Sequence, residues 1–307
     1  MDDYRMRITP PKLLSFAGCM AVSCLIAIPM AGAQKTFLSD DDGMSGETVE
    51  IEIRSLKGAT IKGGGGKVEE SSLNALWSWS FLSLEYQCKS YNWNSPAANP
   101  FSPAHEPVWN TLNTIWLTAG YSNAITQNLR YAMEADVFVS SEREHYGLVG
   151  NDVNGAFFYS FPNDWCAYGG VAVHHSPFQT DVYPLLGIIH GVEFQTGWTL
   201  KVGIPETKVQ YRFNSRCAAD TGFSIFNTDY YRLAIDNIDE HDRYLETSDN
   251  RLFLNFNITT FRNLRVGLGV DYTVNNELIF FSENQQNRTK YQLSNVPGIL
   301  LNMQYSF

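Results

Sequence analysis

Three adjacent residues whose side chains can do acid-base and nucleophilic chemistry, His174, His175 and Ser176, end a stretch of alternating residues. A His side chain can act as the general base that activates a Ser hydroxyl, while a carboxylate orients the imidazole. Asp181 and Glu193 are the carboxylates available downstream. Because a His pair is also an ordinary polar strand end, we treat His174, Ser176 and Glu193 as an alternative catalytic set, not as the main interpretation.

Other candidate groups favour no catalytic or metal site. The segment 236–242 (Asp-Asn-Ile-Asp-Glu-His-Asp) offers oxygen ligands for Ca²⁺, but it lacks the spacing of a known calcium loop, so a solvated acidic loop is expected. Four glycines precede Lys67, but Ile61 and Val68 stand where a phosphate-binding loop needs Gly and Ser or Thr. The Asp and His residues that an acidic protease barrel would need (Asp181, His174, His190 and His241) are scattered along the sequence, and their spacing does not favour such a site. We expect the protein to bind no metal and no cofactor, and we expect that it is not an enzyme.

The composition excludes several classes of protein. The chain has 307 residues, 44% of them hydrophobic, 14% aromatic and 18% charged, with a formal net charge of -10. This apolar content excludes disorder over most of the length. Because the acidic excess repels phosphate groups, no nucleic-acid partner is expected.

The N-terminus has the features of an export signal. Basic residues precede an apolar run that ends at Ala31-Gly32-Ala33, which predicts a signal peptide over residues 1–33. We expect residues 34–72, which are polar and contain the four glycines, to form a flexible periplasmic leader. Three cysteines remain after cleavage (Cys88, Cys166 and Cys217), so at most one disulfide can form.

From residue 73 onwards apolar and polar residues alternate in segments of roughly ten residues, as in half-exposed β-strands. In residues 128–140, for example, Leu129 and Tyr131 share one face, and Arg130 and Glu134 share the other. The expected segments are 75–88, 111–121, 128–140, 152–161, 165–174, 182–193, 197–204, 207–213, 221–234, 249–260, 264–275 and 296–307. The stretch 198–213 is either two strands or one strand bent at Pro205.

The last ten residues resemble the closing strand of bacterial outer-membrane β-barrels. Alternate positions before the terminal aromatic are apolar, and they would form the signal read by the barrel-assembly machinery: Ile299, Leu301, Met303, Tyr305 and Phe307. The long and short connections between the expected strands also alternate, as they do in such barrels. Residues 203–211 resemble the Pro-containing turn of one uncharacterised, porin-like family of these proteins.

These resemblances imply an all-β, transmembrane, antiparallel up-and-down barrel of about 12 strands, with 10 to 14 possible, over residues 73–307. A secreted soluble β-sandwich that binds a ligand is the alternative fold. The implied partners are outer-membrane lipids, lipopolysaccharide, the assembly machinery and small solutes. We expect aromatics such as Trp165, Tyr168, Trp198, Tyr272 and Tyr305 to lie at the membrane interface.

The alternation also separates two faces of the barrel. Leu129, Tyr131, Val266 and Ile299 would contact lipid. The residues expected to line the lumen are charged: Arg130, Glu134, Asp136, Arg212, Arg232, Arg265 and Asp271. They can line a pore or fill the lumen as a salt-bridge network, and the sequence leaves both open. The expected function is a passive pore or a structural surface protein. A lipid hydrolase is the alternative, since His174 and Ser176 resemble the His-x-Ser pair of the lipid A deacylase barrel family.

Overall fold

The computed structural model describes residues 47–63, 66–94, 109–142, 147–191, 195–233, 244–261, 263–281 and 288–307. The expected signal peptide, Glu193 and the acidic segment 236–242 lie outside these ranges. No helix in the described part of the chain is long and apolar enough to cross a membrane.

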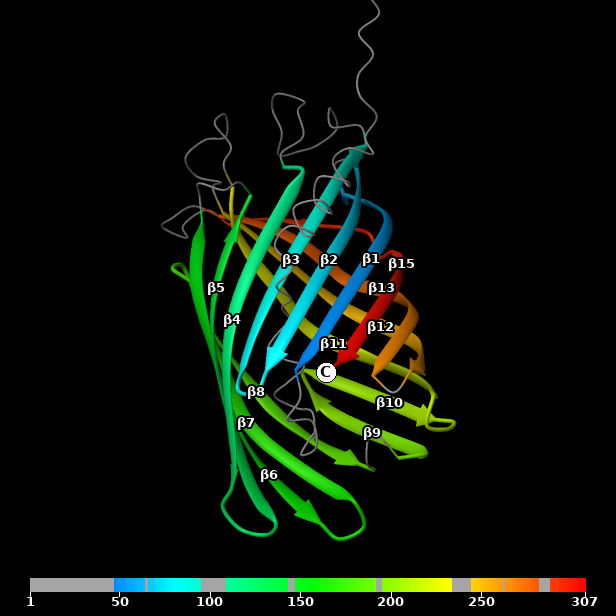
Figure 1. Ribbon diagram of the computed structural model, residues 1–307. Coiled ribbons are helices and arrows are strands. Elements are labelled where there is room, and N and C mark those ends of the chain that lie inside the picture. The colour runs from blue at the N-terminus through cyan, green and yellow to red at the C-terminus, as the bar shows by residue number, and fades with distance from the viewer. Residues whose placement is uncertain are drawn as a thin grey trace, which may run out of the picture.

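Within the described ranges, fifteen β-strands form a single antiparallel sheet (Figure 1). Their bounds are β1 Thr48–Thr60, β2 Lys67–Trp79, β3 Leu82–Asn94, β4 Thr111–Ala124, β5 Leu129–Ser141, β6 Leu148–Phe161, β7 Trp165–His175, β8 Thr180–His190, β9 Gly197–Ile204, β10 Glu206–Arg212, β11 Cys217–Arg232, β12 Tyr244–Phe261, β13 Leu264–Phe281, β14 Thr289–Gln292 and β15 Pro297–Ser306. Each strand from β1 to β13 pairs with the next, β13 pairs with β15, and β15 pairs with β1. Fourteen strands therefore close a barrel, and the short β14 adds to β13.

The alternation places one side chain outside the wall and the next inside. On β5, Met133, Val137 and Val139 are exposed, while Glu134 and Asp136 between them are buried. At the height of β9 and β10, every strand of the wall pairs with a neighbour on both sides, so no sheet edge is free there. This closure separates a barrel from the soluble sandwich alternative. The expected all-β antiparallel barrel is confirmed, with a strand number at the upper end of the stated range.

Two expectations about the N-terminal part are wrong. The segment expected to be a flexible leader contains β1 and the first six residues of β2, so the barrel begins at Thr48. The expected strand 75–88 is in fact the hairpin of β2 and β3, which turns at Ser80 and Phe81. Ser80 adopts a left-handed backbone (φ 54°) without being Gly or Asn, so its turn has no marker in the sequence.

The two ends of the barrel differ. At one end of the barrel, short connections such as Ser80-Phe81 join the strands, and the C-terminal residue lies there; we call it the turn end. We call the opposite end the loop end. The stretch 198–213 forms two antiparallel strands that meet at a cis Ile204–Pro205 bond, which settles the alternative left open above. This hairpin spans only the half of the wall nearest the turn end, because β9 and β10 are 8 and 7 residues long.

Candidate functional site

The outward face of the barrel is apolar over the turn-end half, and on several strands the apolar surface continues toward the loop end. Its exposed aliphatic side chains come from β4–β9, β12, β13 and β15, and Ile299 is among them. Exposed aromatic side chains ring the turn end: Trp79, Phe81, Tyr121, Tyr159, Phe161, Trp165, Trp198, Phe213, Tyr305 and Phe307. An apolar band bordered by aromatics is the surface that a transmembrane barrel presents to lipid. Tyr168, expected at this interface, instead lies buried inside the wall.

The inward face of the same half carries polar and charged groups on several strands. Glu134 and Asp136 on β5 are buried inside, and Asp136 stands opposite Asp152 of β6 in the strand register. The guanidinium of Arg130 lies 4.9 Å from the ring centroid of Phe158 on β6. Asp220 accepts hydrogen bonds from the amides of Asn255 (3.0 Å) and Asn257 (2.7 Å). This half of the interior is therefore polar along β5, β11 and β12, whereas an apolar cluster that includes Phe158, Tyr168 and Ile189 lines it along β6–β8.

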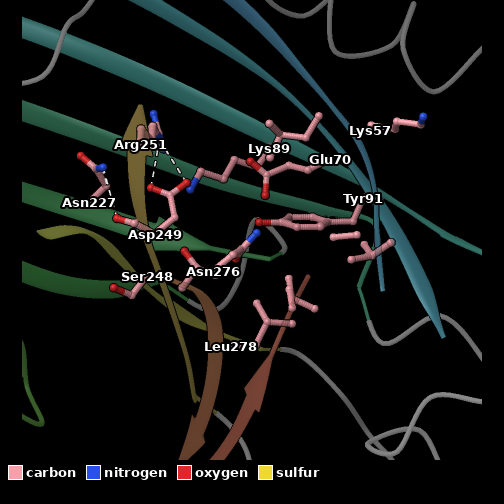
Figure 2. Close-up of a pocket in the computed structure, with 15 residues that line it drawn as sticks. Lys57, Glu70, Lys89, Tyr91, Asn227, Ser248, Asp249, Arg251, Asn276 and Leu278 are labelled. Atoms are coloured by element: carbon pink, nitrogen blue, oxygen red, sulfur yellow. Dashed lines mark hydrogen bonds and ion pairs between the residues drawn. The ribbon is translucent and has the colours of Figure 1, made fainter. Parts of the chain in front are cut away.

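A layer of buried charges lies between this half and the loop end. Arg54 on β1 is at its centre: its Nε lies 2.5 Å from Asp271 on β13, and its Nη1 lies 3.6 Å from Asp249 on β12. Arg251 also contacts Asp249, at 2.9 and 3.0 Å (Figure 2). Because the charges are paired, their burial is tolerated.

A second pair in this layer crosses the lumen. Lys89 on β3 contacts Asp229 on β11 at 2.5 Å, and both side chains are largely buried. Close by, the hydroxyl of Tyr231 donates to Gln87 on β3 at 3.3 Å. Strands β3 and β11 are not neighbours in the sheet, so these contacts link opposite parts of the wall. Figure 2 shows Lys89, Asp249, Arg251 and Tyr91 facing the same small pocket.

Above the charged layer, the interior of the loop end is apolar. We call this cluster the apolar cap; its buried members are Leu56, Ala59, Ile61, Val68, Tyr91, Trp93, Trp109, Leu112, Tyr231, Leu233, Leu245, Leu278, Phe280, Leu293 and Val296. Trp93 and Trp109 pack edge to face at 4.9 Å, and Trp93 donates its Nε1 hydrogen to the carbonyl of Trp109 at 2.7 Å. These side chains come mostly from β1–β3 and β11–β13, and they fill the part of the loop-end interior between those strands.

The loop-end parts of β11 and β12 form one side of this cluster. A register shift between Ser224 and Asn227 interrupts the pairing of β11 with β12. Beyond it, Tyr230 and Tyr231 point to opposite faces of β11, and both are buried, at 3% and 0% exposure. The backbone of β11 contacts β5, because Ser140 donates its hydroxyl hydrogen to the Tyr230 carbonyl. This segment is thus enclosed by the barrel on both faces.

The structure places the expected lumen residues at different levels. Glu134, Asp136, Arg212 and Asp271 are buried on the inward side, and Arg130 and Arg265 are half-buried. Arg232 ends β11 at the loop end, where its guanidinium lies 6.0 Å from the ring centroid of Tyr244. Apart from Asp271, the central members of the charged layer were not among the residues expected to line the lumen. Arg54 lies in the segment expected to be a leader, and Lys89 lies outside the expected strands.

The His174 and Ser176 side chains do not form a base and nucleophile pair in the described residues. The imidazole stacks between Phe138 and Tyr230, at 5.4 and 4.8 Å, and its Nδ1 lies 2.5 Å from Asp152. The Ser176 hydroxyl is buried and donates to the Gln179 carbonyl at 3.3 Å. This geometry packs His174 against β11 and leaves Ser176 to shape the turn between β7 and β8.

Neither a known protein family nor a curated protein matches this chain in sequence. Several solved structures are similar in shape. The deltaS2 mutant of the TodX monoaromatic hydrocarbon channel has a TM-score of 0.48 at 10% identity, over 86% of this chain and 91% of that one. The KdgM porin has a TM-score of 0.37 at 8% identity, over 85% and 99%. The translocator domain of the autotransporter NalP from Neisseria meningitidis has a TM-score of 0.37 at 11% identity, over 98% and 100%.

Proposed function

We propose that this chain is a bacterial outer-membrane β-barrel that admits small solutes passively and is not an enzyme. The observation that carries the proposal is a barrel wall with an apolar outward face and charged residues on its inward face. In a bilayer every backbone polar group must be paired within the protein, and a closed barrel achieves this with strands. A charged inner surface is compatible with water and polar solutes in the lumen, which supports a pore.

Passive entry is tested in a Gram-negative host that lacks its own major porins. We expect the host to take up small solutes faster when it produces the barrel, with no change when an uncoupler removes the proton gradient. Heat-modifiable mobility on gels confirms that the barrel is folded in each sample. A folded barrel that speeds the entry of no solute would contradict the proposal and would favour a structural surface protein.

The hydrolase alternative is tested separately. Since the Ser176 hydroxyl bonds to backbone in the β7–β8 turn, we expect Ser176→Ala and His174→Ala variants to show the same lipid turnover as the wild type. The measurement is release of fatty acid from labelled outer-membrane lipids. Turnover that the wild type supports and both variants lose would establish the hydrolase instead.

A further inference from the structure

Three neighbouring strands are irregular at one level of the wall. The pairing of β11 with β12 shifts register between Ser224 and Asn227, and the pairing of β12 with β13 shifts between Ser248 and Asn250. On β13, beside this second shift, Asn275 has a left-handed backbone (φ 53°). A β-bulge bends a strand and increases its twist, so these irregularities change the course of the sheet. We call the loop-end parts of the three strands the flap: residues 227–232, 244–248 and 277–281.

The flap lies inside the barrel, where β11 contacts β5 and β6. One face of the flap carries Tyr231 and Leu245, which belong to the apolar cap. The opposite face carries Tyr230 and Tyr244, which pack in a cluster with Phe138 of β5. The flap therefore divides the loop-end interior into a part beside β1–β3 and a part beside β5–β7.

The two faces of the flap are held by different kinds of contact. On the face toward β1–β3, the aliphatic and aromatic side chains of the cap pack together, and the buried ion pair of Lys89 with Asp229 lies beside them. On the other face, Ser140 donates its hydroxyl hydrogen to the Tyr230 carbonyl, and the Tyr230 hydroxyl donates to Asp181 at 3.0 Å. Aromatic contacts and single hydrogen bonds thus hold the flap to β5–β8.

The wall on this second side carries a row of polar side chains at one level. Each is the register partner of the next: Thr118, Asp136, Asp152, His174 and Asp181, on β4 to β8 in turn. Within the described part of the chain, neither carboxylate oxygen of Asp136 has a hydrogen-bond partner, and the Thr118 hydroxyl has none. Both side chains are buried, at 1% and 3% exposure. Because such groups lose hydration without a compensating bond, they make the packed state of this boundary less stable than an apolar one.

We infer that the boundary between the flap and β4–β8 is the gate of the pore, along which small solutes pass to the loop end when the flap separates from these strands. The inference rests on the proposed function, because a gate has a role only where solutes enter the lumen. Movement occurs at the irregular level, where the pairing of β11–β13 is already interrupted, and the cap stays packed on the flap. Opening hydrates Asp136 and Thr118, which offsets part of the aromatic contact that is lost.

A reversible disulfide across the boundary tests the gate. The three free cysteines are first replaced by Ala: Cys88, Cys166 and Cys217. Ser140→Cys and Tyr230→Cys are then introduced together, at positions that already meet through a hydrogen bond. The control pair is Thr228→Cys with Ser248→Cys, register partners within the flap whose hydroxyl oxygens lie 3.3 Å apart. The measurement is the swelling rate of liposomes that contain the folded barrel, after arabinose is added, with and without reductant.

We expect the disulfide across the boundary to reduce arabinose entry to the rate of protein-free liposomes, and reductant to restore it. The control disulfide leaves entry unchanged. Arabinose entry that persists when the boundary is fully cross-linked would overturn the gate while leaving passive entry intact. If neither the wild type nor the reduced variants admit arabinose faster than protein-free liposomes, the proposed function itself fails.

A single substitution tests the gate without cross-linking. Tyr230→Phe removes only the hydroxyl that bonds to Asp181, so we expect arabinose entry to rise about tenfold, the factor that one hydrogen bond to a charged group accounts for. Tyr231→Phe is the matched control, because this neighbour donates to Gln87 on the cap side of the flap, and it is expected to leave entry unchanged. Equal entry through the wild type and both variants would overturn the gate.

Discussion

At the scale of single residues, paired charges in a low-dielectric interior link parts of the wall that are not neighbours in the sheet. Lys89 and Asp229 meet across the lumen, and Arg54 contacts acids on both β12 and β13. Such pairs contribute little net stability compared with apolar residues of the same size, but removing one partner leaves the other charge uncompensated. The charged layer therefore specifies which parts of the wall come together.

Replacing one member of the cross-lumen pair tests this view. We expect Lys89→Met to lower the free energy of unfolding by about 3–5 kcal/mol, because the Asp229 carboxylate then stays buried without its partner. The measurement is reversible urea unfolding in lipid vesicles. The control is Lys290→Met, whose pair with Glu277 (2.6 Å) is more exposed and is expected to change stability by less than about 1 kcal/mol. Equal losses of unfolding free energy in the two variants would show that the cross-lumen pair stabilises the barrel no more than an exposed pair does.

A glycine on β9 allows a tyrosine to lie against the inner wall. A Cβ at Gly203 would come within 2.2 Å of the Tyr168 hydroxyl and 2.5 Å of the Leu186 carbonyl oxygen. We expect Gly203→Ala to destabilise the barrel by about 1–3 kcal/mol, since both ring and backbone must move. Gly155→Ala is the matched control, because nothing lies within 4 Å of its Cβ position. Thermal unfolding in detergent compares them; a Gly203 variant as stable as the Gly155 variant contradicts the packing argument.

At the scale of elements, β15 closes the barrel and carries the expected assembly signal. It pairs with β1 on one side and β13 on the other, and its outward residues Ile299, Leu301, Met303 and Tyr305 are exposed to the lipid side. Phe307 follows the strand and packs against Tyr305 at 4.9 Å. The terminal aromatic is therefore exposed in the closed barrel and adds little to its core.

We expect Phe307→Ala to reduce the amount of folded barrel in the outer membrane while leaving the stability of the refolded protein nearly unchanged, because the side chain is exposed in the finished barrel. The measurement is the heat-modifiable fraction in membranes, beside unfolding of purified protein. Phe213→Ala is the control, as Phe213 is an exposed aromatic of the same end. Equal membrane yields for the two variants would rule out a special role for the terminus.

At the scale of the whole molecule, the outward surface changes from apolar to polar along β1. Val49, Ile51 and Ile53 are followed on the same face by Ser55 and Lys57, so the loop end of this strand projects beyond the apolar band. Along β1 the outward face is therefore apolar near the turn end, beside the inward residues Glu50 and Glu52, and polar near the loop end, beside the apolar cap.

A charge placed on the outward face locates the bilayer. We expect Met133→Arg, in the apolar band of β5, to lower the stability by about 2–4 kcal/mol in vesicles, because the guanidinium enters hydrocarbon. Ser55→Arg, on the projecting part of β1, is expected to change it by less than about 1 kcal/mol. Urea unfolding in vesicles gives both values. A reversed order would place the membrane at the other level.

The sequence alone determined the fold class, because the period of two in side-chain polarity marks each half-exposed strand, as on β5 and β15, regardless of its partners. It also assigned Glu134 and Asp136 to the face opposite Met133. It did not determine β1, because the polar loop-end part of this strand resembles a flexible leader. It also did not determine the β2–β3 turn at Ser80. Only the tertiary structure brought Lys89 to Asp229 and Arg54 to Asp249, and only it left β8 and β11 unpaired above Pro205. Those contacts depend on how the sheet curves and closes, which no local pattern of residues encodes.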